Sequence, residues 1–186
     1  MNSSFPRLIT AVMKFDFPNI NNDKTKNMRK NFGSQHWLFP QPVLMIATYN
    51  EDGTPDIMNA AWGGISDSDE ISISISNTHK TAENLLKRGA FTVSFATADQ
   101  VAACDYVGLV SGNKVPDKFA RAGFHAVQSE FVDAPLVEEL PMALECRVRS
   151  YDTETDILRG EIVNVSADET IPVSYTHLTL PTICSV

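Results

Sequence analysis

The stretch SISISNTHKTAEN, residues 72–84, gathers hydroxyls, an imidazole and an ammonium where a predicted strand meets a predicted helix. The first N–H groups of a helix have no intrahelical acceptor, and the helix dipole gives them a positive partial charge. Thr78, Lys80 and Thr81 would add hydroxyl and ammonium donors, and His79 could donate or stack. We therefore predict an anion site suited to a phosphate monoester.

A plainer interpretation of the same residues is open. Asn77 or Thr78 could simply cap the helix, with His79 and Lys80 in solvent and nothing bound. The alternating serines up to Ser76 form a strand face without bulk, on which a flat ring could lie. Serine on the solvent face of a strand is equally ordinary.

The stretch MNAAWGGIS, which begins at Met58, contains unusually small residues for the end of a strand. Asn59, Ala60 and Ala61 precede Trp62, and two glycines follow where bulkier residues would pack better. Small residues there would let a ligand approach the backbone closely. The alternative for Trp62 is a large core anchor.

Mostly two-residue periodicity predicts the elements that must position these groups. An apolar run, an Asn-Glu-Asp-Gly turn with Gly53 at positive φ, and a second run from Pro55 predict a hairpin. A short helix capped at Gly89 follows the serine strand. The remaining expected elements are a strand over 90–97, helices around 99–108 and 115–123, and a strand-turn-strand unit over 142–169. This pattern favours an antiparallel barrel or sandwich over a doubly wound parallel sheet.

The overall composition excludes several classes of protein. The chain has 186 residues, 43% of them hydrophobic, and a formal net charge of -8, from 15 Lys plus Arg against 23 Asp plus Glu. We expect one globular domain, no binding to nucleic acid, no membrane span and a cytoplasmic location. Three scattered cysteines and four scattered histidines predict free thiols and no protein-ligated metal.

Both ends of the chain differ from the middle. Residues 1–27 lack periodicity, so we expect a disordered or non-native extension with the natural start at Met28. From Val173 the sequence VSYTHLTLPT resembles the translation of a transposon-end sequencing adapter. We therefore expect residues 172–186 to be a non-native tail, and a natural protein that continues beyond residue 171.

Three segments, in this order and spacing, resemble the flavin reductase-like, FMN-binding split-barrel proteins that include the flavoredoxins. They are PQPVLMIATYNEDGTPDIMNAAWGG, SISISNTHKTAENLLKRGAFTVSF and VGLVSGNKVPDKFARAGF. The resemblance implies a mainly β domain over 28–171, with a six-stranded antiparallel split barrel and a few short helices. It also implies a homodimer that holds FMN without a covalent bond near the subunit interface.

The resemblance assigns roles to individual residues. The segment from Asn59 through Ala60 and Ala61 to Trp62 would border the flavin ring. The ribityl chain and phosphate would be wrapped by Ser76, Asn77, Thr78, His79, Lys80 and Thr81. The loop with Ser111, Gly112 and Lys118 would lie near the flavin or the partner subunit, or would be merely an exposed polar loop. Asn84 would bond the flavin or cap the strand edge.

The implied function is an oxidoreductase that passes a hydride from NADH or NADPH to FMN, and electrons on to flavin, ferric or other acceptors. No GxGxxG follows a strand, so the nicotinamide would stack on the flavin itself, and no catalytic side chain is required. The alternatives are an FMN electron carrier without its own NAD(P)H oxidation, and an oxidase of the pyridoxine-phosphate type. The family's final segment is replaced here by the unusual tail.

Overall fold

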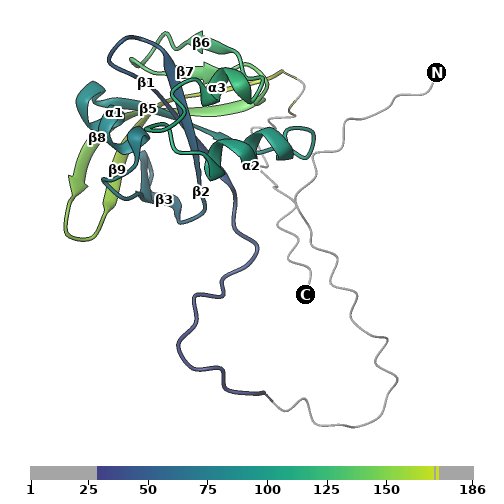
Figure 1. Ribbon diagram of the computed structural model, residues 1–186. Coiled ribbons are helices and arrows are strands. Elements are labelled where there is room, and N and C mark those ends of the chain that lie inside the picture. The colour runs from purple at the N-terminus through teal and green to yellow at the C-terminus, as the bar shows by residue number, and fades with distance from the viewer. Residues whose placement is uncertain (1–28, 170, 172–186) are drawn as a thin grey trace. The chain divides into compact units, whose positions relative to one another are not determined.

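The computed structural model describes residues 29–169 and residue 171. Their contacts divide the chain between Gln41 and Pro42 into two units, which we describe separately. Among the described residues, every helix and strand belongs to the larger unit (Figure 1). The expectations for residues 1–27 and for residues 172–186 lie outside the described residues.

The larger unit begins with the predicted hairpin. Strand β1 (Leu44–Tyr49) pairs antiparallel with β2 (Pro55–Ala60) through a register that runs from Leu44 opposite Ala60 to Tyr49 opposite Pro55. Gly53 takes a φ of 84°, and its N–H donates to the carbonyl of Asn50. The predicted hairpin is confirmed.

A further strand follows at once, and the sequence had not separated it from its neighbours. After a two-residue link, Ala61 and Trp62, strand β3 (Gly63–Asp67) pairs antiparallel with β4 (Glu70–Ser74). The predicted number of six strands is therefore wrong, because the main sheet has seven. The serine strand also ends at Ser74, before Ser76, to which the alternating serines had extended it.

Helix α1 (Lys80–Arg88) begins where the sequence placed it and ends at Gly89, whose φ of 70° is the left-handed conformation expected of a helix cap. The other predicted helices and the final strand-turn-strand unit are also confirmed. Two three-residue strands were not predicted. The remaining elements are β5 (Ala90–Phe95), α2 (Val101–Leu109), α3 (Lys118–Arg121), β6 (Ala126–Gln128), β7 (Pro135–Val137), β8 (Met142–Asp152) and β9 (Ile157–Ala167).

The main sheet is antiparallel throughout, in the order β2-β1-β5-β8-β9-β4-β3, and it curls (Figure 1). Seven strands in a flat sheet would hold the edge strands roughly 29 Å apart. The edges are β2 and β3, yet only two residues join Ala60 to Gly63, a distance of at most about 11 Å. The sheet therefore forms a mainly β half-barrel of the predicted split-barrel type.

Strand β1 is buried on both faces, which explains why its sequence is a continuous apolar run. Leu44 and Ile46 pack into the concave core with residues of β4, β5, α1 and β8. Met45 and Ala47 pack on the opposite face against α2 and α3. Helices α2 and α3 are thus fixed directly behind the β1–β2 hairpin.

In the described part of the chain, no helix is both long and apolar enough to span a membrane.

Candidate functional site

The start of α1 presents unpaired backbone donors. His79 is the N-cap residue, with an extended backbone and no capping side-chain hydrogen bond. The N–H of Glu83 donates to the carbonyl of His79, whereas those of Lys80, Thr81 and Ala82 have no acceptor among the described residues. These three N–H groups and the helix dipole favour an anion at this end.

The segment before α1 folds its hydroxyls toward one another. Ser76 Oγ and Thr78 Oγ1 lie 3.1 Å apart, and the backbone N–H of Thr78 faces Ser76 Oγ at 3.4 Å. Asn77, Thr78 and His79 are exposed. The structure therefore places the first four predicted phosphate-binding residues, Ser76 to His79, on one largely exposed turn, and the last two, Lys80 and the buried Thr81, at the start of α1.

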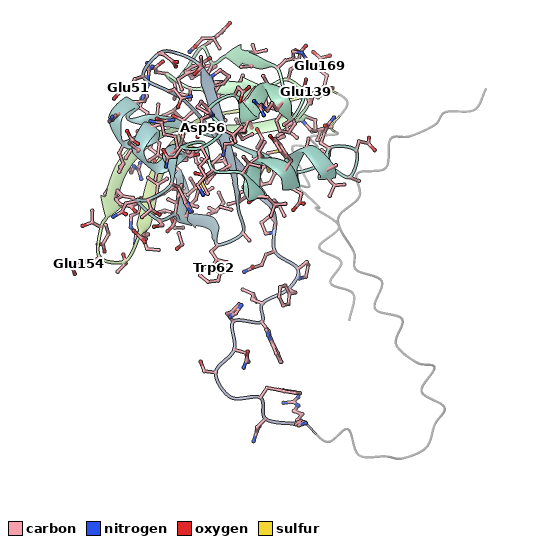
Figure 2. The ribbon with its side chains drawn as sticks, in the orientation of Figure 1. Glu51, Asp56, Trp62, Glu139, Glu154 and Glu169 are labelled. Atoms are coloured by element: carbon pink, nitrogen blue, oxygen red, sulfur yellow. The ribbon has the colours of Figure 1, made fainter. Side chains whose placement is uncertain are left out.

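Asp56 lies beneath this turn and was missed by sequence reasoning (Figure 2). Its side chain is 1% exposed, and its Oδ2 accepts a 2.5 Å hydrogen bond from the hydroxyl of Thr81. The proton of the Thr81 hydroxyl is thus already used within the protein. What Thr81 offers an anion is its backbone N–H.

Lys118 is buried as well, at 3% exposed, and its ammonium is enclosed. Its Nζ donates to the carbonyls of Val107 and Val110 at 3.2 Å each, and lies 3.6 Å from Asp56 Oδ1. Burial lowers the pKa of Lys118, and the Asp56 carboxylate opposes that shift. The alternative that Lys118 belongs to a merely exposed polar loop is therefore wrong for this side chain.

The loop between α2 and α3 approaches the start of α1 through Gly112. A Cβ at Gly112 would lie 2.7 Å from Asp56 Oδ1 and 3.1 Å from Cβ of Lys80, so any larger residue would require a shift. Ser111 is exposed, and its carbonyl accepts two backbone hydrogen bonds that close the loop. Asn113 Nδ2 reaches the carbonyl of Thr78 at 3.5 Å. The structure thus brings the two predicted loop residues beside the predicted anion site.

Lys80 supplies the positive side chain of the site. It is 23% exposed, and its Nζ lies 3.3 Å from the Glu83 carboxylate on the same helix. Because the side chain is partly open to solvent, the ammonium can still face a ligand at the helix start.

The small residues predicted to border a ring lie at the end of β2 and in the link to β3. The amide of Asn59 donates to the carbonyl of Cys104 in α2, at 3.1 Å. Ala60 packs on the concave core, whereas Ala61 is exposed. Trp62 is 59% exposed and lies at the margin of the domain, so it is not a buried anchor (Figure 2). Its carbonyl accepts from the N–H of Ser74, which places this link beside the end of the serine strand.

Asn84 is buried and faces the hairpin turn. Its Nδ2 donates to Asn50 Oδ1 at 2.7 Å, and its own buried Oδ1 has no hydrogen-bond partner among the described residues. This contact ties α1 to the β1–β2 turn.

The tip of the β8–β9 hairpin holds the other side of the turn, a second feature that sequence reasoning missed. The hydroxyl of Tyr151 lies 2.9 Å from the carbonyl of Ile75 and 2.7 Å from Asp156 Oδ1, and the N–H of Ile75 donates to the carbonyl of Asp156. Burial, and then the bond with Asp156, raise the pKa of Tyr151 to about 12. Tyr151 therefore remains a neutral hydrogen-bond donor at physiological pH.

Two other groupings of side chains contain none of the predicted site residues. His125, Glu138 and Glu139 bring potential ligand atoms within 4.8 Å of one another, a proximity that their sequence spacing had not indicated. Glu139 already accepts from the backbone N–H of His125 at 3.0 Å and lies 2.6 Å from its Nδ1.

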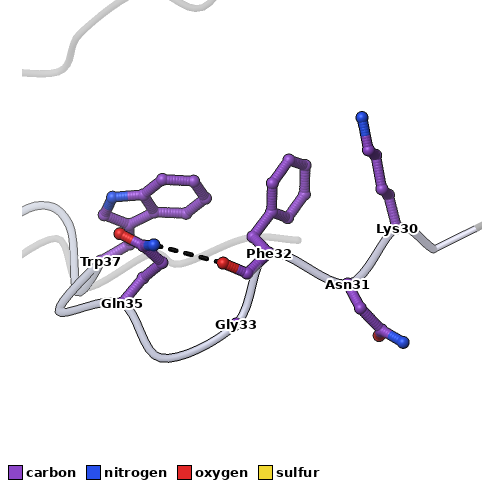
Figure 3. A pocket seen from close by; sticks show the side chains of 6 residues that line it. All are labelled: Lys30, Asn31, Phe32, Gly33, Gln35 and Trp37. Carbon is purple, nitrogen blue, oxygen red and sulfur yellow. Dashed lines mark hydrogen bonds between the residues drawn. The ribbon is translucent and has the colours of Figure 1, made fainter.

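In the smaller unit, a hollow is lined by Lys30, Asn31, Phe32, Gly33, Gln35 and Trp37 (Figure 3). The rings of Phe32 and Trp37 are 5.3 Å apart, and Lys30 Nζ lies 5.7 Å from the centre of the Phe32 ring. This hollow contains none of the predicted site residues.

The chain is similar to known proteins over most of its length. The family model for the flavin reductase like domain matches residues 36–180. Flavoredoxin of Desulfovibrio vulgaris (Miyazaki F) is 39% identical, with a TM-score of 0.73 over 77% of this chain and 78% of that one. Flavoredoxin from Methanosarcina acetivorans is 26% identical, with a TM-score of 0.67 over 76% of each chain. An FMN-binding domain of a flavin reductases-like enzyme from Shewanella baltica OS155 shares the fold, at 21% identity and a TM-score of 0.65 over 69% of each chain.

Proposed function

Because this chain belongs to the family of flavin reductase like domains, we propose that it binds FMN at the start of α1 and works as an NAD(P)H-dependent oxidoreductase. The observation that carries the proposal is the combination of three N–H groups that have no acceptor in the described part of the chain, at Lys80, Thr81 and Ala82, with the Lys80 ammonium. Backbone N–H groups at a helix start and a charged ammonium are both donors that bind a phosphate monoester.

These residues fit the phosphate end of FMN. The N–H groups at the helix start and the ammonium of Lys80 would meet its charge, and the hydroxyls of Ser76 and Thr78 would add hydrogen bonds. His79 and Asn77 are exposed beside them and complete the turn. Gly112, where a Cβ would lie 2.7 Å from Asp56 Oδ1, lets the α2–α3 loop pack directly against Lys80.

The link from Ala60 through Ala61 to Trp62 would border the ring system. Its small side chains and the 59% exposed indole support this assignment. Ser111 would lie at the rim, beside Gly112. We assign Asn84 and Lys118 to holding the site, because both side chains are buried and bonded within the protein.

FMN, when bound, supplies the redox chemistry, accepting a hydride and passing electrons onward. The chain's own residues bind the phosphate, orient the ring and hold its surroundings fixed. We further propose that the protein is a cytoplasmic homodimer. The acceptor of its electrons would be a flavin, a ferric compound or another type of molecule. Light scattering on the purified chain tests the dimer.

A second candidate is an FMN electron carrier that does not itself oxidise NAD(P)H. The observation that favours it is the 39% identity to the flavoredoxin of Desulfovibrio vulgaris. The same site serves both functions, so binding alone cannot distinguish them.

In the first step of the test, the purified chain is titrated with FMN, and binding is measured by the quenching of flavin fluorescence. NADH and NADPH oxidation is then measured with bound FMN, against a protein-free flavin control. Turnover above that control supports the reductase. Saturable binding without turnover, in protein whose flavin passes electrons after photoreduction, identifies the carrier. An absence of FMN binding would refute both functions.

A further inference from the structure

We propose that Asp56 is a positioning residue that fixes the start of α1 and the α2–α3 loop against each other, and so presets the phosphate-binding N–H groups. This inference rests on the proposed function of that site. Asp56 is the second residue of β2, opposite Thr48 in the rigid hairpin, and is 1% exposed.

Each oxygen of the Asp56 carboxylate serves a different element. Oδ2 accepts the 2.5 Å bond from Thr81, the second residue of α1. Oδ1 lies 3.6 Å from Nζ of Lys118, the first residue of α3. One side chain on a fixed strand therefore holds the two segments whose separation determines the width of the site.

The charge of Asp56 is balanced by Lys118 and not by the solvent. A buried carboxylate or ammonium is costly alone, so each group requires the other. Lys118 also donates to the carbonyls of Val107 and Val110, which extends the connection to the end of α2. Removing the carboxylate would leave a buried ammonium beside neutral groups and would loosen the loop.

The Thr81 bond controls the orientation of the first helical turn. Its hydroxyl has one proton, and donating it to Asp56 fixes the side chain beneath the helix. The N–H groups of Lys80, Thr81 and Ala82 have no acceptor among the described residues and stay available to a ligand. Gly112 completes the arrangement, because only a residue without a Cβ fits between Asp56 and Lys80.

The experiment compares FMN with riboflavin, which has the same ring but no phosphate. Binding constants are measured by fluorescence titration for the full chain and for Asp56→Asn. We expect Asp56→Asn to weaken FMN binding about tenfold, the effect of losing one hydrogen bond to a charged group, with riboflavin affinity nearly unchanged. Equal weakening of both ligands, or unchanged FMN affinity, would overturn the positioning role.

Two further variants complete the design. Thr81→Val removes only the hydroxyl bond and should show the same selective loss, so the proposal remains testable if Asp56→Asn does not fold. Glu145→Gln is the matched control, because Glu145 is also 1% exposed but bonds Ser129 and Asn164, away from α1. It should bind both ligands like the unmutated chain. Failure of the unmutated chain to bind FMN would instead overturn the proposed function.

Discussion

The hydroxyl of Thr81 donates a 2.5 Å hydrogen bond to Oδ2 of Asp56, although the two residues lie 25 positions apart in the chain. This bond joins the first turn of α1 to the strand β2 behind it. The residue that sequence motifs mark as a phosphate ligand therefore also secures the helix on which the phosphate would rest.

Lys80→Ala removes the positive side chain at the helix start. We expect FMN affinity to fall about tenfold and riboflavin affinity to stay nearly constant, because only FMN carries the phosphate. Fluorescence titration with both ligands measures the difference. Lys87→Ala is the control, since Lys87 lies in the last turn of the same helix and also pairs with Glu83. If both variants lose FMN equally, the local assignment of Lys80 is wrong.

Gly112→Ala tests the close approach of the α2–α3 loop. The added Cβ would lie 2.7 Å from Asp56 Oδ1, and Asp56 cannot move without breaking its contacts with Thr81 and Lys118. We expect a loss of about 1 to 3 kcal/mol in the free energy of unfolding, the usual effect of overpacking, measured by denaturant titration. Gly64→Ala, where a Cβ meets nothing within 4 Å, should have a much smaller effect. Equal stability of the two variants would contradict the close contact.

Tyr151→Phe removes the hydroxyl that holds the turn before α1. Loss of its contacts with Ile75 and Asp156 should lower the free energy of unfolding by about 1 kcal/mol. Tyr49→Phe is a suitable comparison, because the Tyr49 hydroxyl makes no hydrogen bond to any described residue. Similar stability of Tyr151→Phe and the unmutated chain would show that the hairpin tip does not hold the turn.

The pair of His125 and Glu139 predicts a pH dependence of stability. Hydrogen bonding to Glu139 raises the pKa of His125 above 6.5, so its contribution is full below that value and is lost as the pH rises through the folded-state pKa. Burial acts to raise the pKa of Glu139, but hydrogen bonds from His125 outweigh it and lower the pKa below 4.5. That contribution is present above 4.5 and is lost as the pH falls through the folded-state pKa.

The pair should therefore stabilise the fold most between pH 4.5 and pH 6.5, the ordinary pKa values of the two groups. Thermal unfolding across this window, compared between the unmutated chain and His125→Gln, measures the effect. The difference between the two proteins should shrink on both sides of the window. His36→Gln, in the smaller unit, serves as the control histidine. A difference that does not change with pH would exclude the ion pair as its source.

Local signals in the sequence predicted most of the fold. Gly53 and Gly89 take the positive φ values that their turn and cap positions suggested, and both flanking elements follow from them. Strand β3 was missed for a physical reason. It is an edge strand that begins with two glycines and is mostly exposed, so it has no alternation of buried and exposed residues to detect.

Some residues of the candidate site could likewise be predicted from the sequence, and others could not. The hydroxyls and ammonium near α1 are contiguous, so their spacing alone indicated an anion site. Asp56 gave no such signal, because a lone aspartate after a hairpin turn normally lies in solvent. Its partners Thr81 and Lys118 become visible only when the sheet brings β2 behind both helices.

The order of strands also determines when the site can form during synthesis. In the sheet, β8 and β9 lie between β5 and β4, so strands β3 and β4 are hydrogen-bonded into the same sheet as β1, β2 and β5 only through the last hairpin. Ile75, just before the anion site, bonds the turn between β8 and β9. In a nascent chain on the ribosome, β4 and the turn that follows it therefore obtain these pairing partners only after the final hairpin has emerged, and the edges that β5 and β4 offer to β8 and β9 stay unpaired until then.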